Sequence, residues 1–176
     1  MKLLVYLKQR MSNKKLLFFI IFISIALLIG SYLLINKPDE QQTKVLSYSA
    51  TDKNKPAAEI NENFKKLGNI KVSDTSKTTF KIKNSGTKPL QLSKINSSCG
   101  CTAGQIIYKG VISKEYSMHS KSSDIFEIAP NTEAELIVVY RPFTMPVYGF
   151  VEREVYIFTN DPNNPKLSFK IQANVN

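Results

Sequence analysis

Cys99, Gly100, Cys101 and Thr102 form the motif of this 176-residue chain whose residue types are best suited to chemistry, and no second such cluster stands out. In an extended strand, residues i and i+2 point to the same face, so the two sulfur atoms are expected to project together. Gly100 allows the backbone to tighten or turn between them. Such a pair can close a disulfide, bind a soft metal ion, or fill the core as two small buried thiols. All three possibilities stay open from the sequence.

A metal site would need further ligands. Thiolates of Cys99 and Cys101 suit Cu(I) or Zn(II), but two cysteines do not complete a tetrahedral zinc site, which needs four nitrogen or sulfur ligands. His119 is the single histidine, and Met118 beside it is the nearest thioether in the sequence. Both lie in a Ser- and Lys-rich segment. The first expectation is therefore no cofactor, with copper as the alternative.

A redox role for the cysteines depends on the compartment and on the size of the ring that they close. An oxidising compartment outside the cytoplasmic membrane favours a disulfide. A ring closed over one intervening residue is expected to be strained and easily reduced, which makes thiol exchange a second alternative. Hydrolytic catalysis needs a nucleophile, a base and an orienting acid, and one histidine supplies no such motif. The sequence favours a protein that is not an enzyme, with thiol-redox activity as the exception.

Residues 16–35 form a run of 20 residues without a charge. A helix of this length covers about 30 Å, the thickness of the hydrocarbon core of a bilayer. No small-x-small cleavage site follows, so an uncleaved anchor is favoured over a signal peptide. Residues 1–15 carry five positive charges and no negative ones. We therefore expect a cytoplasmic basic tail, a single inner-membrane span, and an exported C-terminal part in the periplasm or another extracytoplasmic space.

The charge of the chain does not indicate a nucleic-acid partner. The formal net charge is +10, and half of it lies in residues 1–15. Neither a basic face interleaved with aromatic residues nor a known nucleic-acid motif is present. Polar residues with Pro38 and Pro56 near the ends occupy 36–56, which predicts a linker.

Period-two alternation of apolar residues starts near Ala57. The clearest case runs from Leu167 to Val175, and 134–140 is apolar on both faces, as in a central strand. Ile95 breaks the parity of Leu90 and Leu92, which predicts a bulge just before the cysteines. Residues 103–127 show the least pattern and are expected to form a long loop. Short strands separated by turns predict an antiparallel β-sandwich.

Four aromatic residues lie around Pro142 and Pro146, at the end of the apolar strand at 134–140 and just after it: Tyr140, Phe143, Tyr148 and Phe150. They are expected to cover the core or a sheet edge rather than to form a ligand platform.

Residues 57–176 resemble a known bacterial family, the domain of unknown function 1573. The motifs that carry the resemblance are FKIKNSG at 80–86, SCGCT at 98–102, IAPN at 128–131 and TNDP at 159–162. Asn131 stands where the family usually has glycine, and the segment after Thr102 is longer than usual. The resemblance implies an immunoglobulin-like sandwich in an exported protein and no established activity. We expect a protein-binding or scaffolding module whose sheet edges or end loops contact another envelope protein.

Overall fold

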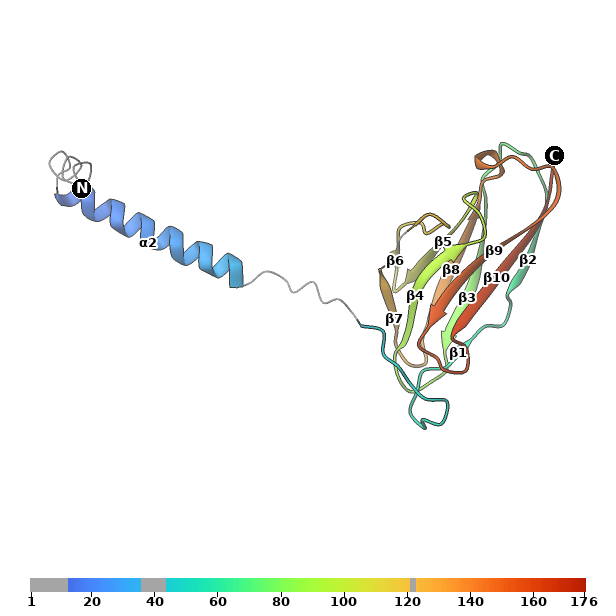
Figure 1. The fold of residues 1–176 in the computed structure, drawn as a ribbon, viewed down its shortest axis with the longest axis horizontal. Helices are drawn as coiled ribbons and strands as arrows, with labels where there is room; N and C mark the ends of the chain where they lie inside the picture. Colours follow the sequence, from blue (N-terminus) through green and yellow to red (C-terminus); the bar gives the residue numbers. More distant parts are fainter. Residues whose placement is uncertain (1–12, 36–43, 121–122) are drawn as a thin grey trace. The chain divides into compact units, whose positions relative to one another are not determined.

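The structure, a computed structural model, describes residues 13–35, 44–120 and 123–176. The chain divides into two units, Met1–Gln42 and Thr43–Asn176, which are treated separately here (Figure 1). Most of the predicted cytoplasmic tail (1–15) and residues 36–43 of the predicted linker lie outside the described residues.

The first unit contains helix α2, Asn13–Ile35, which forms over the uncharged run. Leucine, isoleucine and phenylalanine occupy every face of this helix, and large apolar side chains such as Phe18 and Phe22 are exposed. Among the helices that the structure describes, none is found to be long and apolar enough to cross a membrane. The predicted anchor at 16–35 is therefore not supported and stays a prediction.

The second unit is a β-sandwich. Its described strands are β1 Ala58–Glu59, β2 Phe64–Ile70, β3 Ser76–Asn84, β4 Leu90–Ser97, β5 Thr102–Tyr108, β6 Val111–Ile112, β7 Ile125–Ile128, β8 Glu133–Tyr140, β9 Gly149–Thr159 and β10 Lys166–Val175. They form two five-stranded sheets with the orders β1-β3-β8-β5-β6 and β2-β10-β9-β4-β7. The predicted all-β sandwich is thus confirmed.

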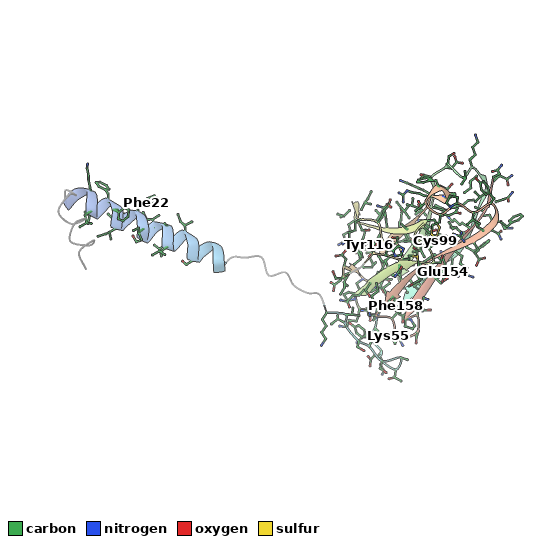
Figure 2. The ribbon with its side chains drawn as sticks, turned by 45° about the horizontal axis from the view of Figure 1, so that its top comes forward. Phe22, Lys55, Cys99, Tyr116, Glu154 and Phe158 are labelled. Atoms are coloured by element: carbon green, nitrogen blue, oxygen red, sulfur yellow. A yellow bond between two sulfur atoms is a disulfide. The ribbon has the colours of Figure 1, made fainter. Side chains whose placement is uncertain are left out.

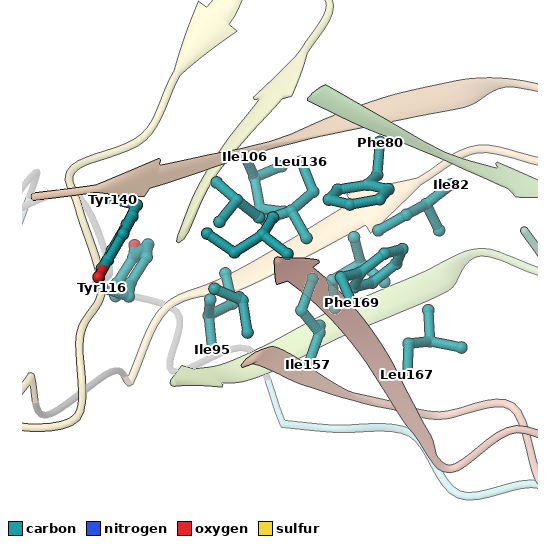
Figure 3. Packing of buried hydrophobic residues seen from close by; sticks show 14 of the residues in the cluster. Phe80, Ile82, Ile95, Ile106, Tyr116, Leu136, Tyr140, Ile157, Leu167 and Phe169 are labelled. Carbon is teal, nitrogen blue, oxygen red and sulfur yellow. The ribbon is translucent and has the colours of Figure 1, made fainter. Parts of the chain in front are cut away.

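The core lies between the two sheets, as Figure 3 shows. The rings of Phe80 on β3 and Phe169 on β10 meet across it, with their centroids 5.2 Å apart. Strand β10 contributes every second residue to the core, as the alternation predicted: Leu167, Phe169, Ile171, Ala173 and Val175. Strand β8 lies between β3 and β5, which confirms the prediction of a central strand.

Two sequence expectations about strands were wrong. The sandwich is not wholly antiparallel, because β2 pairs with β10 in parallel. The chain crosses from β1 in one sheet to β2 in the other. There β2 lies beside β10 and runs in the same direction. The predicted loop at 103–127 contains most of β5, all of β6 and most of β7. Period-two alternation is hidden in β5 because Gly104 carries no side chain and two isoleucines follow in succession.

The predicted bulge before the cysteines is present. The pairing of β4 with β9 shifts register between Ser93 and Asn96, and Lys94 has a φ of 46°. This bulge lets Ile95 reach the core although its parity differs from that of Leu92.

Part of the predicted linker belongs to the sandwich. The backbone N–H of Leu46 donates to Gln91 Oε1 at 2.7 Å, and Thr87 N–H donates to the carbonyl of Lys55 at 3.0 Å. Residues 44–56 therefore lie against the end of the domain where β4 begins and β9 ends. The connection from β8 to β9 lies at the other end, beside the C-terminus (Figure 1).

Candidate functional site

The two cysteines lie in a turn, not in an extended strand as the sequence suggested. Strand β4 ends at Ser97, β5 begins at Thr102, and the N–H of Thr102 donates to the carbonyl of Cys99 at 3.3 Å. This turn carries the chain from one sheet to the other. It brings the Cα atoms of Cys99 and Cys101 to 5.3 Å, and a disulfide joins them.

The disulfide is buried in the sandwich. Cys99 is 8% exposed and Cys101 is 2% exposed (Cys99 is labelled in Figure 2). An attacking thiolate has to reach a sulfur atom in line with the bond that it breaks. The small exposed fraction of both side chains disfavours rapid exchange with a bulky partner, and it suits a structural staple.

Polar contacts hold the turn from within. The hydroxyl of Ser97 is placed to donate to the carbonyls of Cys99, at 2.8 Å, and Thr102, at 2.7 Å. The buried Thr102 Oγ1 lies 3.3 Å from Cys99 Sγ and, because a disulfide sulfur carries no hydrogen, the hydroxyl is the donor.

Backbone contacts tie the same turn to both sheets. The N–H of Ser98 donates to the carbonyl of Glu154 at 2.9 Å, and the Ser98 hydroxyl accepts the N–H of Glu154 at 3.0 Å. On the other sheet, the N–H of Arg141 donates to the carbonyl of Cys101 at 2.8 Å. The turn is therefore fixed in position by β9 and by the end of β8.

The segment after β5 does reach the cysteine turn. A Cβ atom built on Gly100 would lie 3.8 Å from His119 Nε2 and 3.9 Å from Met145 Sδ. The thioether beside the turn is thus that of Met145, which sequence reasoning missed, while Met118 is 44% exposed. No local signal could have identified Met145, because it is distant from the cysteines in the sequence.

The described residues contain no group of three or more His, Cys, Asp or Glu side chains placed to hold a metal ion. As disulfide sulfurs, Cys99 and Cys101 offer no thiolate, so copper binding through them would first need reduction of the bond. Copper binding by Cys99, Cys101, His119 and Met118 stays an untested alternative from the sequence.

Tyr116 fixes the segment that carries His119. Its backbone exchanges two hydrogen bonds with Gly104, each of 2.9 Å, and its buried side chain donates from the hydroxyl to Asp124 Oδ2 at 2.6 Å. Burial and this carboxylate raise the pKa of Tyr116 well above its ordinary value. Hydrogen bonds from Lys114 and Tyr116 lower the pKa of Asp124.

The connection between β8 and β9, together with the start of β9, exposes large apolar side chains, which we call the apolar end: Phe143, Met145, Val147, Tyr148 and Phe150. The expectation that these aromatic residues cover the core or an edge is correct only for Tyr140, which is fully buried. Tyr148 is 67% exposed and Phe150 is 81% exposed. The short 3₁₀ turn Pro142–Thr144 begins the connection, and Phe150 projects from β9 itself.

An ion pair braces the base of the apolar end. Arg141 donates two hydrogen bonds to the carboxylate of Glu115, at 2.8 and 2.7 Å. These bonds lower the pKa of Glu115 and raise that of Arg141. Planar, two-point contacts of this kind fix orientation better than a single lysine contact does.

The Cys99→Ala/Cys101→Ala double variant is expected to lose about 2 kcal/mol of unfolding free energy. A closed loop of three residues restricts the unfolded chain only modestly, by about 1.6 kcal/mol in the chain-entropy model. Urea denaturation measures the loss. Alkylation without prior reduction, followed by intact mass, is expected to add no alkyl group to the wild type. Two added groups, or a double variant as stable as the wild type, would contradict a structural disulfide.

Comparison with solved structures finds proteins that share the sandwich. A protein of unknown function from Porphyromonas gingivalis W83 is 19% identical, with a TM-score of 0.55, and the match covers 72% of this chain and 50% of that one. This chain therefore spans half the length of that protein. A PapD-like domain of human CEP192 is 13% identical, with a TM-score of 0.47, over 76% of this chain and 95% of that one. These similarities are of fold alone.

Comparison with curated protein sequences finds no match. A family model does match, and it covers residues 58–175, which include the ten strands that the structure describes and the cysteine turn. The chain belongs to the family of proteins of unknown function called DUF1573.

Proposed function

We propose that this protein is a binding or scaffolding module of the bacterial cell envelope, and that the apolar end is its docking surface for another folded envelope protein. The observation that carries the proposal is the exposure of five large apolar side chains between Phe143 and Phe150. Clustered exposed apolar residues are uncommon on soluble domains and mark sites of interaction. Aromatic anchors such as Tyr148 and Phe150 dominate the energetics of protein interfaces.

The support beneath the cluster favours a protein partner. Pro142, Pro146 and the Arg141–Glu115 pair restrict the connection before any partner arrives, which lowers the entropy lost on binding. The side chains are exposed on the connection and at the start of β9 instead of lining an enclosed cavity, as a small-molecule site would. The cluster lies at the end of the sandwich away from residues 44–56, so it faces away from the segment through which the chain enters the domain.

The proposal includes a membrane anchor at 16–35, with the N-terminus in the cytoplasm and the sandwich outside. Its support is the length of the uncharged run and the five positive charges that precede it. Anchoring would confine the sandwich to the membrane surface and so raise its effective concentration near a membrane-bound partner.

Site-specific photo-crosslinking tests the docking surface. A photoreactive phenylalanine analogue replaces Tyr148 in the full chain, expressed in the bacterium that encodes it. Phe158, exposed on β9, is the matched control position. We expect a discrete crosslinked product from position 148 and none from 158. Adding Phe150→Ser should reduce that product at least about tenfold, because truncating a hot-spot aromatic residue typically costs 2 kcal/mol or more.

Two outcomes would contradict the proposal. The first is the same set of crosslinked products from positions 148 and 158, which would indicate random collision. The second is a product from position 148 that Phe150→Ser leaves unchanged.

A further inference from the structure

Strand β3 has a side that no other described strand covers. It pairs with β8 along its length, but on its other side only Lys83 and Asn84 are paired, with β1. Strand β1 ends at Glu59, where the chain leaves the edge of β3 and crosses to β2 in the other sheet. Residues 76–82 of β3 therefore form an open edge.

The open edge presents backbone groups that a further strand can bind. Lys65 Nζ donates to the carbonyl of Thr79 at 2.7 Å, so this carbonyl points away from β8. In an antiparallel strand, the N–H and C=O of one residue point to the same side, and the side alternates along the chain. Lys77, Thr79 and Lys81 therefore all present both groups at the open edge. In the described part of the chain, the Thr79 carbonyl alone among these six groups has a hydrogen-bond partner.

A groove follows this edge. It has a volume of about 410 Å³ and is lined by Asn61, Glu62, Lys65, Thr79, Phe80, Lys81 and Glu135. Lys65 crosses it from β2, and its ammonium lies 5.3 Å from the centre of the Phe80 ring. The Phe80 ring is only 1% exposed, so the aliphatic stem of Lys65, and not the ring, forms the apolar part of the groove wall.

The other free edges are less suited to strand addition. β6 has two residues and β7 has four. In β2, Gly68 has a φ of 76°, and the pairing with β10 shifts register between Gln172 and Ala173. β3 thus provides the longest regular edge in the described residues.

The charges along the edge indicate what would bind. Lys77 is exposed on the outer face of β3 and makes no ion pair within the described residues, whereas Lys81 is paired with Glu133 at 2.8 Å and Lys83 already lies opposite Glu59 of β1. An added strand would place alternate side chains beside Lys77 and Lys81, and acidic residues there would be favoured. Its other side chains would face the groove beside the aliphatic stem of Lys65, where apolar residues fit.

We propose that the open edge of β3 binds an extended segment of another protein by strand addition, with acidic residues facing outward and apolar residues facing the groove. About five residues of the segment would pair with 77–81. A peptide N–H would replace the Lys65 ammonium at the Thr79 carbonyl and leave that ammonium free to meet an acidic side chain. This site is separate from the apolar end and does not depend on it.

The experiment uses two fluorescein-labelled, amidated peptides, Glu-Val-Glu-Ile-Glu-Val-Glu and Lys-Val-Lys-Ile-Lys-Val-Lys, titrated with the full chain in mild detergent. The acidic peptide is expected to bind at least tenfold more tightly than the basic one. Thr79→Pro removes one outward N–H but keeps the hydrogen bonds to β8, so it should weaken binding at least tenfold. Thr79→Val keeps the N–H and should bind like the wild type. Near-UV circular dichroism confirms that each variant is folded.

Lys77→Glu gives a second readout that does not disturb the backbone. It should weaken the acidic peptide severalfold and strengthen the basic one. Two results would overturn the proposal: the wild type binds both peptides with the same affinity, or folded Thr79→Pro binds the acidic peptide as tightly as the wild type does. Absence of binding would also do so, and the edge lysines would then only guard against aggregation. If the wild-type chain self-associates and Thr79→Pro abolishes this, the open edge of β3 binds a second copy of the chain. That result would also overturn the proposal.

A Tyr148→Ser/Phe150→Ser variant is expected to bind the acidic peptide like the wild type. If the peptide-binding experiment fails, the crosslinking test at position 148 is unaffected. If the crosslinking experiment fails, the peptide-binding test of the β3 edge is unaffected.

Discussion

The Asn84→Leu variant is expected to have a free energy of unfolding about 4 kcal/mol lower than that of the wild type. Asn84 is fully buried at the end of β3, and its side chain makes four hydrogen bonds. Nδ2 donates to the carbonyls of Lys88 and Ile128, at 2.8 and 2.9 Å. Oδ1 accepts the N–H groups of Gly86 and Ala57, at 3.0 and 3.3 Å. Leucine satisfies none of these four backbone groups, and each unsatisfied buried group costs about 1–3 kcal/mol.

The measurement is urea denaturation of the full chain, followed by near-UV circular dichroism of its tyrosines. Ser85→Ala is the matched control, because the neighbouring hydroxyl is exposed and lies 3.4 Å from its acceptor, the carbonyl of Ala57. That control should change stability by no more than about 0.5 kcal/mol. A loss below about 1 kcal/mol for Asn84→Leu, with an unchanged urea slope, would show that the four backbone groups find other partners.

Asn84 illustrates what the sequence could and could not reveal. The residue types of Asn84-Ser85-Gly86 are typical of a turn, and the chain does turn there. Two partners of Asn84, Gly86 and Lys88, lie in the same turn, and the other two, Ala57 and Ile128, come from distant segments. Nothing in the local pattern shows that these backbone groups converge on one amide. A sequence pattern reports which face of a strand is apolar, whereas a hydrogen-bond centre depends on contacts between distant segments.

The same contrast holds around the cysteines. The bulge at Ile95 was predictable because a break in parity is local. The packing of His119 and Met145 over Gly100 was not, because it depends on how Tyr116 pairs with Gly104 and on where the chain goes after β8. Asn131 is an intermediate case. It stands where the family usually has glycine, and its φ of 58° is a left-handed conformation that asparagine tolerates better than most residues do.

The two ends of the sandwich differ in a way that bears on function. The end where residues 44–56 enter is closed by buried polar side chains, among them Asn84, Gln91, Asn160 and Asp161. Satisfied polar networks of this kind hold one arrangement of several segments. The other end exposes apolar side chains above a rigid turn. The closed end therefore suits attachment to the rest of the chain, and the apolar end suits contact with a partner.

Gly86→Ala and Gly100→Ala are the same substitution in two turns, and they are expected to differ by about 3 kcal/mol. A Cβ on Gly86 would lie 2.4 Å from the carbonyl oxygen of Lys55 and 2.5 Å from the nitrogen of Ala57. Both are backbone atoms, so the backbone of residues 55–57 would have to move away from Gly86. Overpacking of this kind typically costs about 1–3 kcal/mol, and the lost hydrogen bonds add to it. A Cβ on Gly100 would meet side chains at ordinary contact distances of 3.6 Å or more.

Urea denaturation of both variants checks the difference. Gly100→Ala should be neutral or slightly stabilising, because alanine restricts the unfolded chain more than glycine does. Gly86→Ala should release residues 55–57, and the same segment is held by Asn84 through the N–H of Ala57. The double variant Asn84→Leu/Gly86→Ala should therefore cost less than the sum of the two single variants. Additive losses would show that the two residues act on separate segments. Equal stability of Gly86→Ala and Gly100→Ala would show that residues 55–57 detach without loss and that the folded unit begins after them.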